Sequence, residues 1–274
     1  MPELPEAETI VRDLQRKVTG RTITGSKVSF ADILGNGLTP RRLASLVRGK
    51  RIEQVERRAK KVVLRLSGDL ALVISLGMTG RVVASKAARA QELRHIAVRF
   101  ELDDGTALLY DDARRFGSIE VYPHDRWHER QLSLGVEPLS DEFTPEKLFA
   151  LTRTSIMPIR NWLLDQTRVS GIGNIYASEA LFRAGVRPTR RARTLSRAET
   201  ERLRDTLRDV LNESINKRGT TVSDYRDADG IEGGFAALLY VYDRAGLPCL
   251  RCGTAVKRVV FTNRSAFYCP QCQK

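Results

Sequence analysis

Four cysteines lie near the end of the 274-residue chain, in two pairs with two residues inside each pair. The pairs are Cys249/Cys252 and Cys269/Cys272, and sixteen residues separate them. Two such pairs at this spacing are typical of a zinc site. Because four thiolates close the tetrahedral shell around the metal, we expect one structural Zn²⁺ per chain, with no open position for catalysis.

The first eight residues, MPELPEAE, place an amine beside carboxylates. Removal of Met1 would leave Pro2 with a secondary amine, and α-amines titrate near about pH 8, so part of it is nucleophilic at neutral pH. Attack on a sugar C1′ would give an iminium ion, which is an electron sink. Glu3 and Glu6 could then shuttle protons and hold the amine in place. An acidic first turn that only favours the helix dipole is the alternative interpretation.

A glycine pair precedes a predicted helix in the second half of the chain, where residues 171–174 read GIGN. Glycines let backbone amides approach a ligand closely, and a helix N-terminus favours anions. Asn174 could therefore cap the helix or bind a phosphate, although a tight turn explains the glycines equally well.

The charge balance points to a polyanionic partner. Lys and Arg number 46 against 33 acidic residues, which gives a net charge of +13. The excess gathers in residues 41–61 and 183–218, and two separated basic regions suit a cleft that grips a duplex through its phosphates. A merely basic soluble protein is the alternative. No stretch approaches the roughly 18 apolar residues of a membrane span, and no signal peptide opens the chain, so we expect a cytoplasmic protein with no membrane partner.

These groups must be positioned by two kinds of structure. Apolar spacing predicts a helix over residues 5–18, and β-branched or apolar segments separated by turn residues follow it. This first half favours an antiparallel sandwich or barrel. Residues 217–235 form a long loop, and such loops are often functional. The predicted strands are 62–66, 70–76, 81–84, 96–102, 106–110 and 118–122, and the later predicted helices are 144–152, 159–164, 174–184 and 196–216.

Taken together in order, these segments resemble the formamidopyrimidine-DNA glycosylase family over the whole chain. The combination is far more specific than any one motif. The matching segments are PELPEAE at 2–8, RRAKK at 57–61, LGMTG at 76–80, DARRFG at 112–117, GIGNIYASEALF at 171–182, VYDRAGLPC at 241–249 and the terminal FYCPQCQK.

The resemblance implies a multidomain α+β fold. It comprises an N-terminal antiparallel β-sandwich with a catalytic helix, and a C-terminal helix-two-turn-helix domain with a zinc-finger hairpin. The implied division is a catalytic domain over 1–132, a linker over 133–142, a helical domain with a lesion-capping loop over 143–235, and a zinc finger over 236–274.

The resemblance also implies a bifunctional enzyme of base excision repair. It would excise 8-oxoguanine and formamidopyrimidines from duplex DNA through a Schiff base on Pro2 and nick the strand by β,δ-elimination, acting as a monomer on nucleoid DNA in a bacterium. The implied catalytic residues are Pro2, Glu3, Glu6, Lys60 and Arg264; the DNA-binding residues are Met78, His95, Arg114, Phe116, Asn174 and Tyr242; and the base-recognition residues are Glu179, Ser223 and Tyr225.

Met78, Arg114 and Phe116 match the triad that fills the gap left by a flipped nucleotide. An enzyme must extrude a stacked base to reach C1′, and inserted apolar wedges offset the unstacking cost. For an isolated Met or Phe, ordinary core is the alternative. The chain departs from the family at Ser75, where histidine is common, at Ala113, where some relatives have proline, and at Asp243, where glycine is common beside Tyr242.

Three other functions compete with this prediction. An endonuclease VIII-like enzyme for oxidised pyrimidines is the nearest, but Leu4 and the Met-Arg-Phe triad argue against it. A non-catalytic zinc-finger DNA-binding protein would need none of the N-terminal residues. A metal-dependent nuclease is the weakest, because the aspartates lie in turns and His95, His124 and His128 have no ligand spacing.

Overall fold

The computed structural model describes residues 2–86, 93–222, 225–261 and 264–274. Contacts divide the chain into two compact units. Unit 1 comprises Met1–Leu132 and Ile215–Gly234, and unit 2 comprises Ser133–Ser214 and Phe235–Lys274. The long loop predicted over residues 217–235 therefore lies almost wholly in unit 1.

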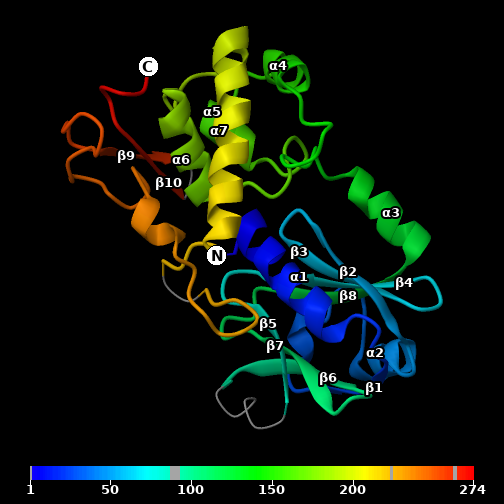
Figure 1. The fold of residues 1–274 in the computed structure, drawn as a ribbon. Helices are drawn as coiled ribbons and strands as arrows, with labels where there is room; N and C mark the ends of the chain where they lie inside the picture. Colours follow the sequence, from blue (N-terminus) through cyan, green and yellow to red (C-terminus); the bar gives the residue numbers. More distant parts are fainter. Residues whose placement is uncertain (1, 87–92, 223–224, 262–263) are drawn as a thin grey trace. The chain divides into compact units, whose positions relative to one another are not determined.

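Unit 1 is a sandwich of two antiparallel sheets, each with four strands among the described residues (Figure 1). A two-residue hairpin joins β2 to β3, and β3 pairs with β4, but the chain passes through the other sheet before β8 returns to pair with β4. In sheet order, the first sheet is β1 (Ile23–Val28), β6 (Ile96–Leu102), β7 (Thr106–Asp111) and β5 (Arg81–Lys86), and the second is β2 (Ile52–Arg58), β3 (Lys61–Leu66), β4 (Leu70–Ser75) and β8 (Ser118–Pro123).

The core of unit 1 lies between the two sheets. Side chains from both inner faces, such as Leu64, Ile74 and Phe100, are fully buried there. Strands β3 and β4 are also buried on their outer face, where Val63 and Val73 pack with Trp127. This double burial explains their continuous apolar sequence, because a strand covered on both sides needs no polar face.

Three helices complete unit 1: α1 (Leu4–Val18), α2 (Pro40–Val47) and α3 (His124–Leu132). Helix α1 contacts β2 and β3 of one sheet and β5 of the other, so it covers an edge of the sandwich. Its apolar face, which includes Ile10 and Leu14, is fully buried in the core. A capping box between Glu3 and Glu6 starts the helix, and Pro5 fits its first turn because that turn needs few amide donors.

Unit 2 is helical and ends in a β-hairpin (Figure 1). Helix α6 is buried almost throughout its length and ends at Gly185, whose φ of 73° is the left-handed cap that favours glycine. The buried apolar stripe of α7 includes Leu203, Leu207 and Leu211. The elements are α4 (Pro145–Arg153), α5 (Ile159–Leu164), α6 (Asn174–Ala184), α7 (Arg197–Asn216), β9 (Lys257–Phe261) and β10 (Arg264–Tyr268).

The predicted α+β fold is confirmed, and the predicted helices and strands agree with the observed ones to within two residues at each end. Elements with polar sequences escaped the prediction. Strand β2 (IEQVERR) buries only two of its residues, and α3 (HDRWHERQL) buries only Trp127. Neither shows the apolar periodicity on which the prediction depends. Among the described residues, no helix is both long and apolar enough to span a membrane.

Candidate active site

The N-terminal residues of unit 1 form a buried polar turn. Pro2, Glu3 and Glu6 are all buried at the start of α1. Glu6 accepts hydrogen bonds from two backbone amides, that of Glu3 at 2.7 Å and that of Thr220 at 2.8 Å. Two fixed donors hold the Glu6 carboxylate in one orientation, so it ties the N-terminus to the loop near residue 220. The Glu3 carboxylate lies in the same buried turn beside Pro2.

Lys60 occupies the two-residue turn of the β2–β3 hairpin. Ala59, the other turn residue, has a φ of 54°, which costs energy for any residue with a Cβ. Arg57 holds this turn from the side: its Nη1 donates to the Ala59 carbonyl at 3.1 Å, and its Nε donates to Glu8 of α1 at 2.9 Å. The hairpin that carries Lys60 is thus pinned to the helix that carries the N-terminal turn.

Ser75, one of the departures from the family pattern, lies directly across the strand pair from Lys61. The Lys61 ammonium contacts the Ser75 hydroxyl. Burial lowers the pKa of Lys61, while the nearby Glu120 carboxylate acts in the opposite direction. At the position where histidine is common, this chain therefore has a serine that is paired with a partly buried lysine.

Two loops at one end of the sandwich expose the predicted wedge residues. Residues 76–80 follow β4 and carry Met78, and residues 112–117 join β7 to β8 and carry Arg114 and Phe116. Met78 is 38% exposed and Phe116 is 62% exposed, so neither is an ordinary core residue. The Arg114 guanidinium carbon lies 4.7 Å from the centre of the Phe116 ring. His95 is exposed, and its backbone amide donates to Asp111 at 2.8 Å.

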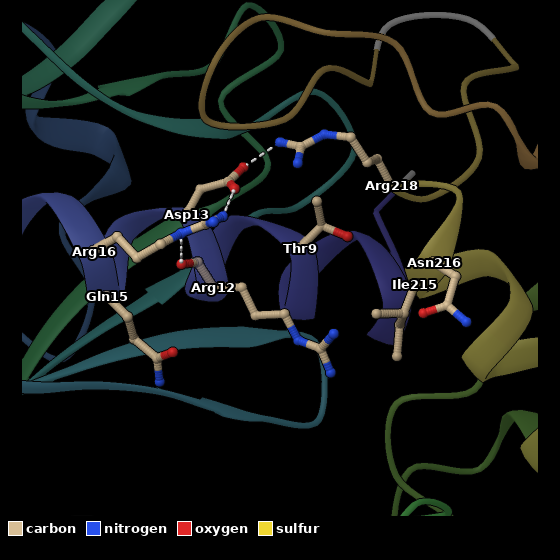
Figure 2. A pocket seen from close by; sticks show the side chains of 8 residues that line it. All are labelled: Thr9, Arg12, Asp13, Gln15, Arg16, Ile215, Asn216 and Arg218. Atoms are coloured by element: carbon tan, nitrogen blue, oxygen red, sulfur yellow. Dashed lines mark hydrogen bonds and ion pairs between the residues drawn. The ribbon is translucent and has the colours of Figure 1, made fainter.

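An arginine clamp fixes the base of the loop that follows α7. Arg218, in the left-handed conformation with a φ of 61°, donates to Asp13 of α1 (Figure 2) and to Asp227 of the loop, each at 2.5 Å. Lys17 pairs with Asp229 beside it. The three aspartates lie close enough together to suggest a metal site, but Arg218 and Lys17 already neutralise them. Asp13 and Arg218 also line a pocket of about 480 Å³ between α1 and the end of α7.

Of the predicted base-recognition residues in this loop, Ser223 lies outside the described residues. Tyr225 is buried and packs into the core of unit 1. Burial raises the pKa of Tyr225, and the negative charge of Glu6 adds to the rise. An ideal Cβ on Gly219 would lie 2.9 Å from the Tyr225 ring, so glycine is needed there for the loop to pass over the ring. The exposed large apolar side chains among the described residues of this loop are Val222 and Ile231.

In unit 2, Glu179 is fully buried in α6 and acts on the backbone. Its carboxylate accepts the amides of Tyr240, Val241 and Tyr242 at 2.8–2.9 Å. Burial raises the pKa of Glu179, and the three amides oppose that rise. Glu179 therefore fixes the segment that presents Tyr242. The next residue, Asp243, has a φ of 58°, which explains why glycine is common at this position.

Asn174 begins α6 and connects three elements of unit 2. Its Oδ1 accepts from Arg160 of α5 at 2.7 Å, and its Nδ2 donates to the Ser265 carbonyl of β10 at 2.9 Å. Burial lowers the pKa of the Arg160 guanidinium, and the charge of Arg264 lowers it further. Arg264 itself is exposed at the start of β10. The sequence prediction missed Arg160, because no motif marks it and its burial appears only in the structure.

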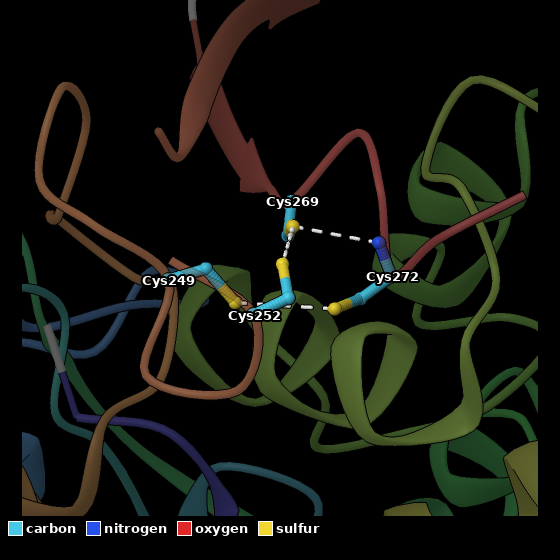
Figure 3. Close-up of side chains that lie close together, drawn as sticks. All are labelled: Cys249, Cys252, Cys269 and Cys272. Carbon is cyan, nitrogen blue, oxygen red and sulfur yellow. Dashed lines mark hydrogen bonds between the residues drawn. The ribbon is translucent and has the colours of Figure 1, made fainter. Parts of the chain in front are cut away.

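The four cysteines come together in unit 2 (Figure 3), with all four sulfur atoms within 4.8 Å of one another. The Sγ atoms of Cys249 and Cys272 are 4.0 Å apart, and those of Cys252 and Cys269 are 3.5 Å apart. A tetrahedral zinc ion with Zn–S bonds of about 2.3 Å requires sulfur separations of about 3.8 Å, so the cluster fits one structural Zn²⁺. The cluster agrees with the predicted structural Zn²⁺ and its four cysteine ligands. The ion would hold the loops of the finger together and leave no coordination position open for a reaction.

Comparison with known proteins covers both units. Three family models match: the formamidopyrimidine-DNA glycosylase N-terminal domain over residues 1–119, its helix-two-turn-helix domain over residues 134–226, and a zinc finger found in these enzymes and in isoleucyl-tRNA synthetases over residues 246–274. Formamidopyrimidine-DNA glycosylases from Chloroflexus aggregans and Pelotomaculum thermopropionicum are 40% and 42% identical to the whole chain, which covers 98% and 99% of their lengths.

Solved structures agree with this assignment. The MutM protein of Thermus thermophilus superposes with a TM-score of 0.88 at 39% identity, over 99% of this chain and 98% of that one. A Lactococcus lactis relative, solved in complex with DNA that contains an abasic site, superposes with a TM-score of 0.91 at 28% identity over 99% of both chains. The chain therefore belongs to the formamidopyrimidine-DNA glycosylase family, whose members are DNA glycosylases and AP lyases of base excision repair.

Proposed function

We propose that this chain excises oxidised purines, 8-oxoguanine and formamidopyrimidines, from duplex DNA and then nicks the strand through a covalent intermediate on Pro2. The observation that carries the proposal is the buried N-terminal turn. There a secondary amine, available once Met1 is removed, stands beside the Glu3 carboxylate in a site shielded from water. Burial strengthens the electrostatic effect of each group on the reacting atoms.

The reaction follows from these groups. The Pro2 nitrogen attacks C1′ of the damaged nucleotide and gives up its own proton, the bond from C1′ to the base breaks, and the base leaves with the electron pair and that proton. Glu3 donates a proton to the sugar ring oxygen, which opens the ring and leaves an iminium ion at C1′. Loss of a C2′ proton then expels the 3′ phosphate, and a second elimination expels the 5′ phosphate. Glu6 acts indirectly, because its carboxylate is held by the amides of Glu3 and Thr220.

In this proposal the protein binds DNA through its phosphates, and three inserted side chains open the base stack. We assign phosphate contacts to Lys60, His95, Asn174, Tyr242 and Arg264, and the space left by the flipped nucleotide to Met78, Arg114 and Phe116. Support comes from their exposure or partial exposure and from the net charge of +13. Base recognition is assigned to the loop of Ser223 and Tyr225 and, through the backbone of residues 240–242, to Glu179.

The domain division at residues 132, 142 and 235 remains part of this proposal. We further propose that the chain acts as a monomer on damaged double-stranded DNA in the bacterial cytoplasm, associated with the nucleoid through that DNA. The relatives named above come from bacteria, which supports the bacterial assignment. The Lactococcus protein was solved on DNA that contains an abasic site, which supports damaged DNA as the partner.

Borohydride trapping tests the chemistry directly. The processed protein, shown by mass spectrometry to begin at Pro2, is incubated with a duplex that carries 8-oxoguanine opposite cytosine, and borohydride is added. A cross-link at Pro2 is expected, because reduction converts the iminium ion into a stable amine. An adduct on an internal lysine would overturn the assignment of the nucleophile.

Two matched reactions give the controls. A chain whose N-terminus is extended by a short peptide should bind the same duplex and form no adduct, because its Pro2 nitrogen is an amide. A duplex with an oxidised pyrimidine should be trapped more slowly than the 8-oxoguanine duplex. Faster trapping on the pyrimidine would assign the chain to the endonuclease VIII-like specificity instead.

A further inference from the structure

The two wedge loops pose a physical problem that hydrophobic burial does not solve. Phe116 and Met78 expose 62% and 38% of their surface, and Arg114 is exposed beside them. Apolar side chains in water tend to fold back onto the protein surface, because burial of apolar area is favourable. The loops need another source of order if they are to hold these side chains outward before DNA arrives.

Asp112 supplies that order. Its side chain is fully buried and accepts four hydrogen bonds, two on each oxygen. Oδ1 accepts from the Thr79 hydroxyl at 2.6 Å and from the Arg114 amide at 3.3 Å. Oδ2 accepts from the Gly117 amide at 2.9 Å and from the Tyr110 hydroxyl at 3.0 Å. One carboxylate thus binds the Met78 loop through Thr79 and both ends of the Arg114–Phe116 segment.

Glycines bring the same two loops into backbone contact. An ideal Cβ on Gly77 would lie 2.4 Å from the Gly117 nitrogen and 2.5 Å from the Phe116 carbonyl carbon. An ideal Cβ on Gly117 would lie 1.7 Å from the Tyr110 hydroxyl. No side chain fits at either position, so the loops pack main chain against main chain around Tyr110 and Asp112. Such packing leaves little freedom to the residues between the glycines.

We propose that Asp112 is a positioning residue that holds the wedge in its inserting conformation before DNA binds. This inference rests on the proposed function, because it assumes that the wedge enters the base stack. Opening the stack costs a few kcal/mol. A wedge that is already ordered adds no further entropy cost of its own at that step, whereas a disordered one would. Asp112 acts through Thr79, Arg114 and Gly117, and it touches neither the sugar nor the base.

Asparagine at position 112 is a sharp probe of this role. The two side chains have the same shape, but an amide replaces one acceptor oxygen with an NH₂ donor. Each oxygen of Asp112 faces a backbone N–H, that of Arg114 or that of Gly117. A backbone N–H can only donate. In either orientation, the NH₂ group of the asparagine would therefore face one of these N–H groups, and the hydrogen bonds on that side would be lost.

The test compares two single-turnover reactions of the full chain. One is excision of 8-oxoguanine from a duplex, which needs the stack to be opened. The other is strand cleavage at a preformed abasic site in a single-stranded oligonucleotide, which does not. Asp112→Asn should slow the duplex reaction by about tenfold or more and change the single-strand reaction by less than about twofold. A 2-aminopurine beside the lesion should report slower base extrusion in the variant.

Asp104→Asn is the matched control, because Asp104 lies at the other end of β7 and also accepts an amide and a hydroxyl, both from Thr106. It should leave both rates unchanged. If Asp112→Asn lowers the Tm so far that folding is in doubt, Tyr110→Phe decides. It removes one of the four donors to Asp112, together with the bond from Tyr110 to the Ser75 carbonyl, and should give a smaller loss with the same selectivity for duplex.

The outcomes separate the two proposals. A wild-type protein without either activity would refute the proposed function itself. An active wild type, with variants that lose both rates equally or lose neither, would overturn the positioning role and leave the proposed function intact.

Discussion

The N-terminal turn of unit 1 and the residues of unit 2 that we propose to bind phosphate differ most clearly in burial. Pro2, Glu3 and Glu6 are buried, whereas Asn174 and Tyr242 are half-buried and Arg264 is exposed. The difference follows from the tasks we assign to them. Proton transfer and nucleophilic attack gain from a site without bulk water, because charges interact more strongly there. Phosphates lie on the outside of a duplex, so the groups that bind them must reach the surface.

The two regions are also stabilised differently. Backbone amides that are far apart in the sequence hold the carboxylates of unit 1, as in the bond from Thr220 to Glu6, which spans 214 residues. Four thiolates that lie close together in the sequence hold the finger of unit 2 around one metal ion. We therefore expect activity to depend most strongly on single polar groups in unit 1, and the folding of the finger to depend on its metal ion.

The largest expected effect is in unit 1. Pro2→Gly replaces a secondary amine with a primary one and removes the ring that fixes its direction. We expect turnover of 8-oxoguanine duplex to fall by on the order of a thousandfold, with Kd for the same duplex changed by less than about threefold.

Arg264→Ala should do the reverse, weakening DNA binding about tenfold with a smaller effect on the single-turnover rate at saturating enzyme. Stopped-time gel assays and fluorescence anisotropy measure the two quantities. A Pro2→Gly enzyme with undiminished turnover would remove the contrast between the regions.

Removal of zinc should break unit 2 selectively. Structural zinc is worth on the order of 10 kcal/mol or more to small fingers, so a chelator should unfold the finger and weaken DNA binding by about a hundredfold. The signal from the β-sandwich in far-UV circular dichroism should persist, and added Zn²⁺ should restore binding. Undiminished affinity in protein shown by elemental analysis to be metal-free would contradict the structural role of the ion.

A smaller effect concerns acid. Arg190 lies 2.5 Å from Glu199 at the start of α7, and this pairing lowers the pKa of Glu199 from 4.5 to about 2. A carboxylate whose pKa falls on folding stabilises the folded state above the unfolded pKa, and this contribution is lost as the pH falls from about 4.5 towards 2. Glu199→Gln should therefore cost about 1 kcal/mol at pH 7 and progressively less below pH 4.5. Denaturant titrations at pH 7 and pH 3 measure this, and a cost that does not shrink at pH 3 would argue against the ion pair.

The smallest predicted effect sharpens the comparison at Tyr242. Asp243→Gly places the residue without a Cβ at a φ of 58° and removes a negative charge beside a proposed phosphate contact. We expect a gain of about 0.5 kcal/mol in the free energy of unfolding and about twofold tighter DNA binding at low salt. Thermal unfolding and anisotropy at two salt concentrations test both parts. Weaker binding by the glycine variant would show that the charge of Asp243 does not act on DNA.

Local patterns decided much of this protein before any contact between distant residues was known. The cysteine spacing predicted the metal because one short hairpin brings both pairs together. Apolar spacing predicted α1 to within one residue, because its buried face repeats at the helical period. Strands β3 and β4 were predictable because burial on both faces leaves an apolar run, while β2 and α3 were missed because each buries only one or two side chains.

Only the tertiary structure decided what holds the site together. Asp112 reads in the sequence as one aspartate of a turn, and its four donors come from two loops and a strand. Glu179 matched an acidic residue near the base, and the structure adds that its carboxylate binds the backbone of residues 240–242. Arg160 and Arg218 carried no motif at all. The physical reason is common to them: a buried or half-buried charge is defined by the donors and acceptors that surround it, and the fold brings these together without leaving a periodic pattern in the sequence.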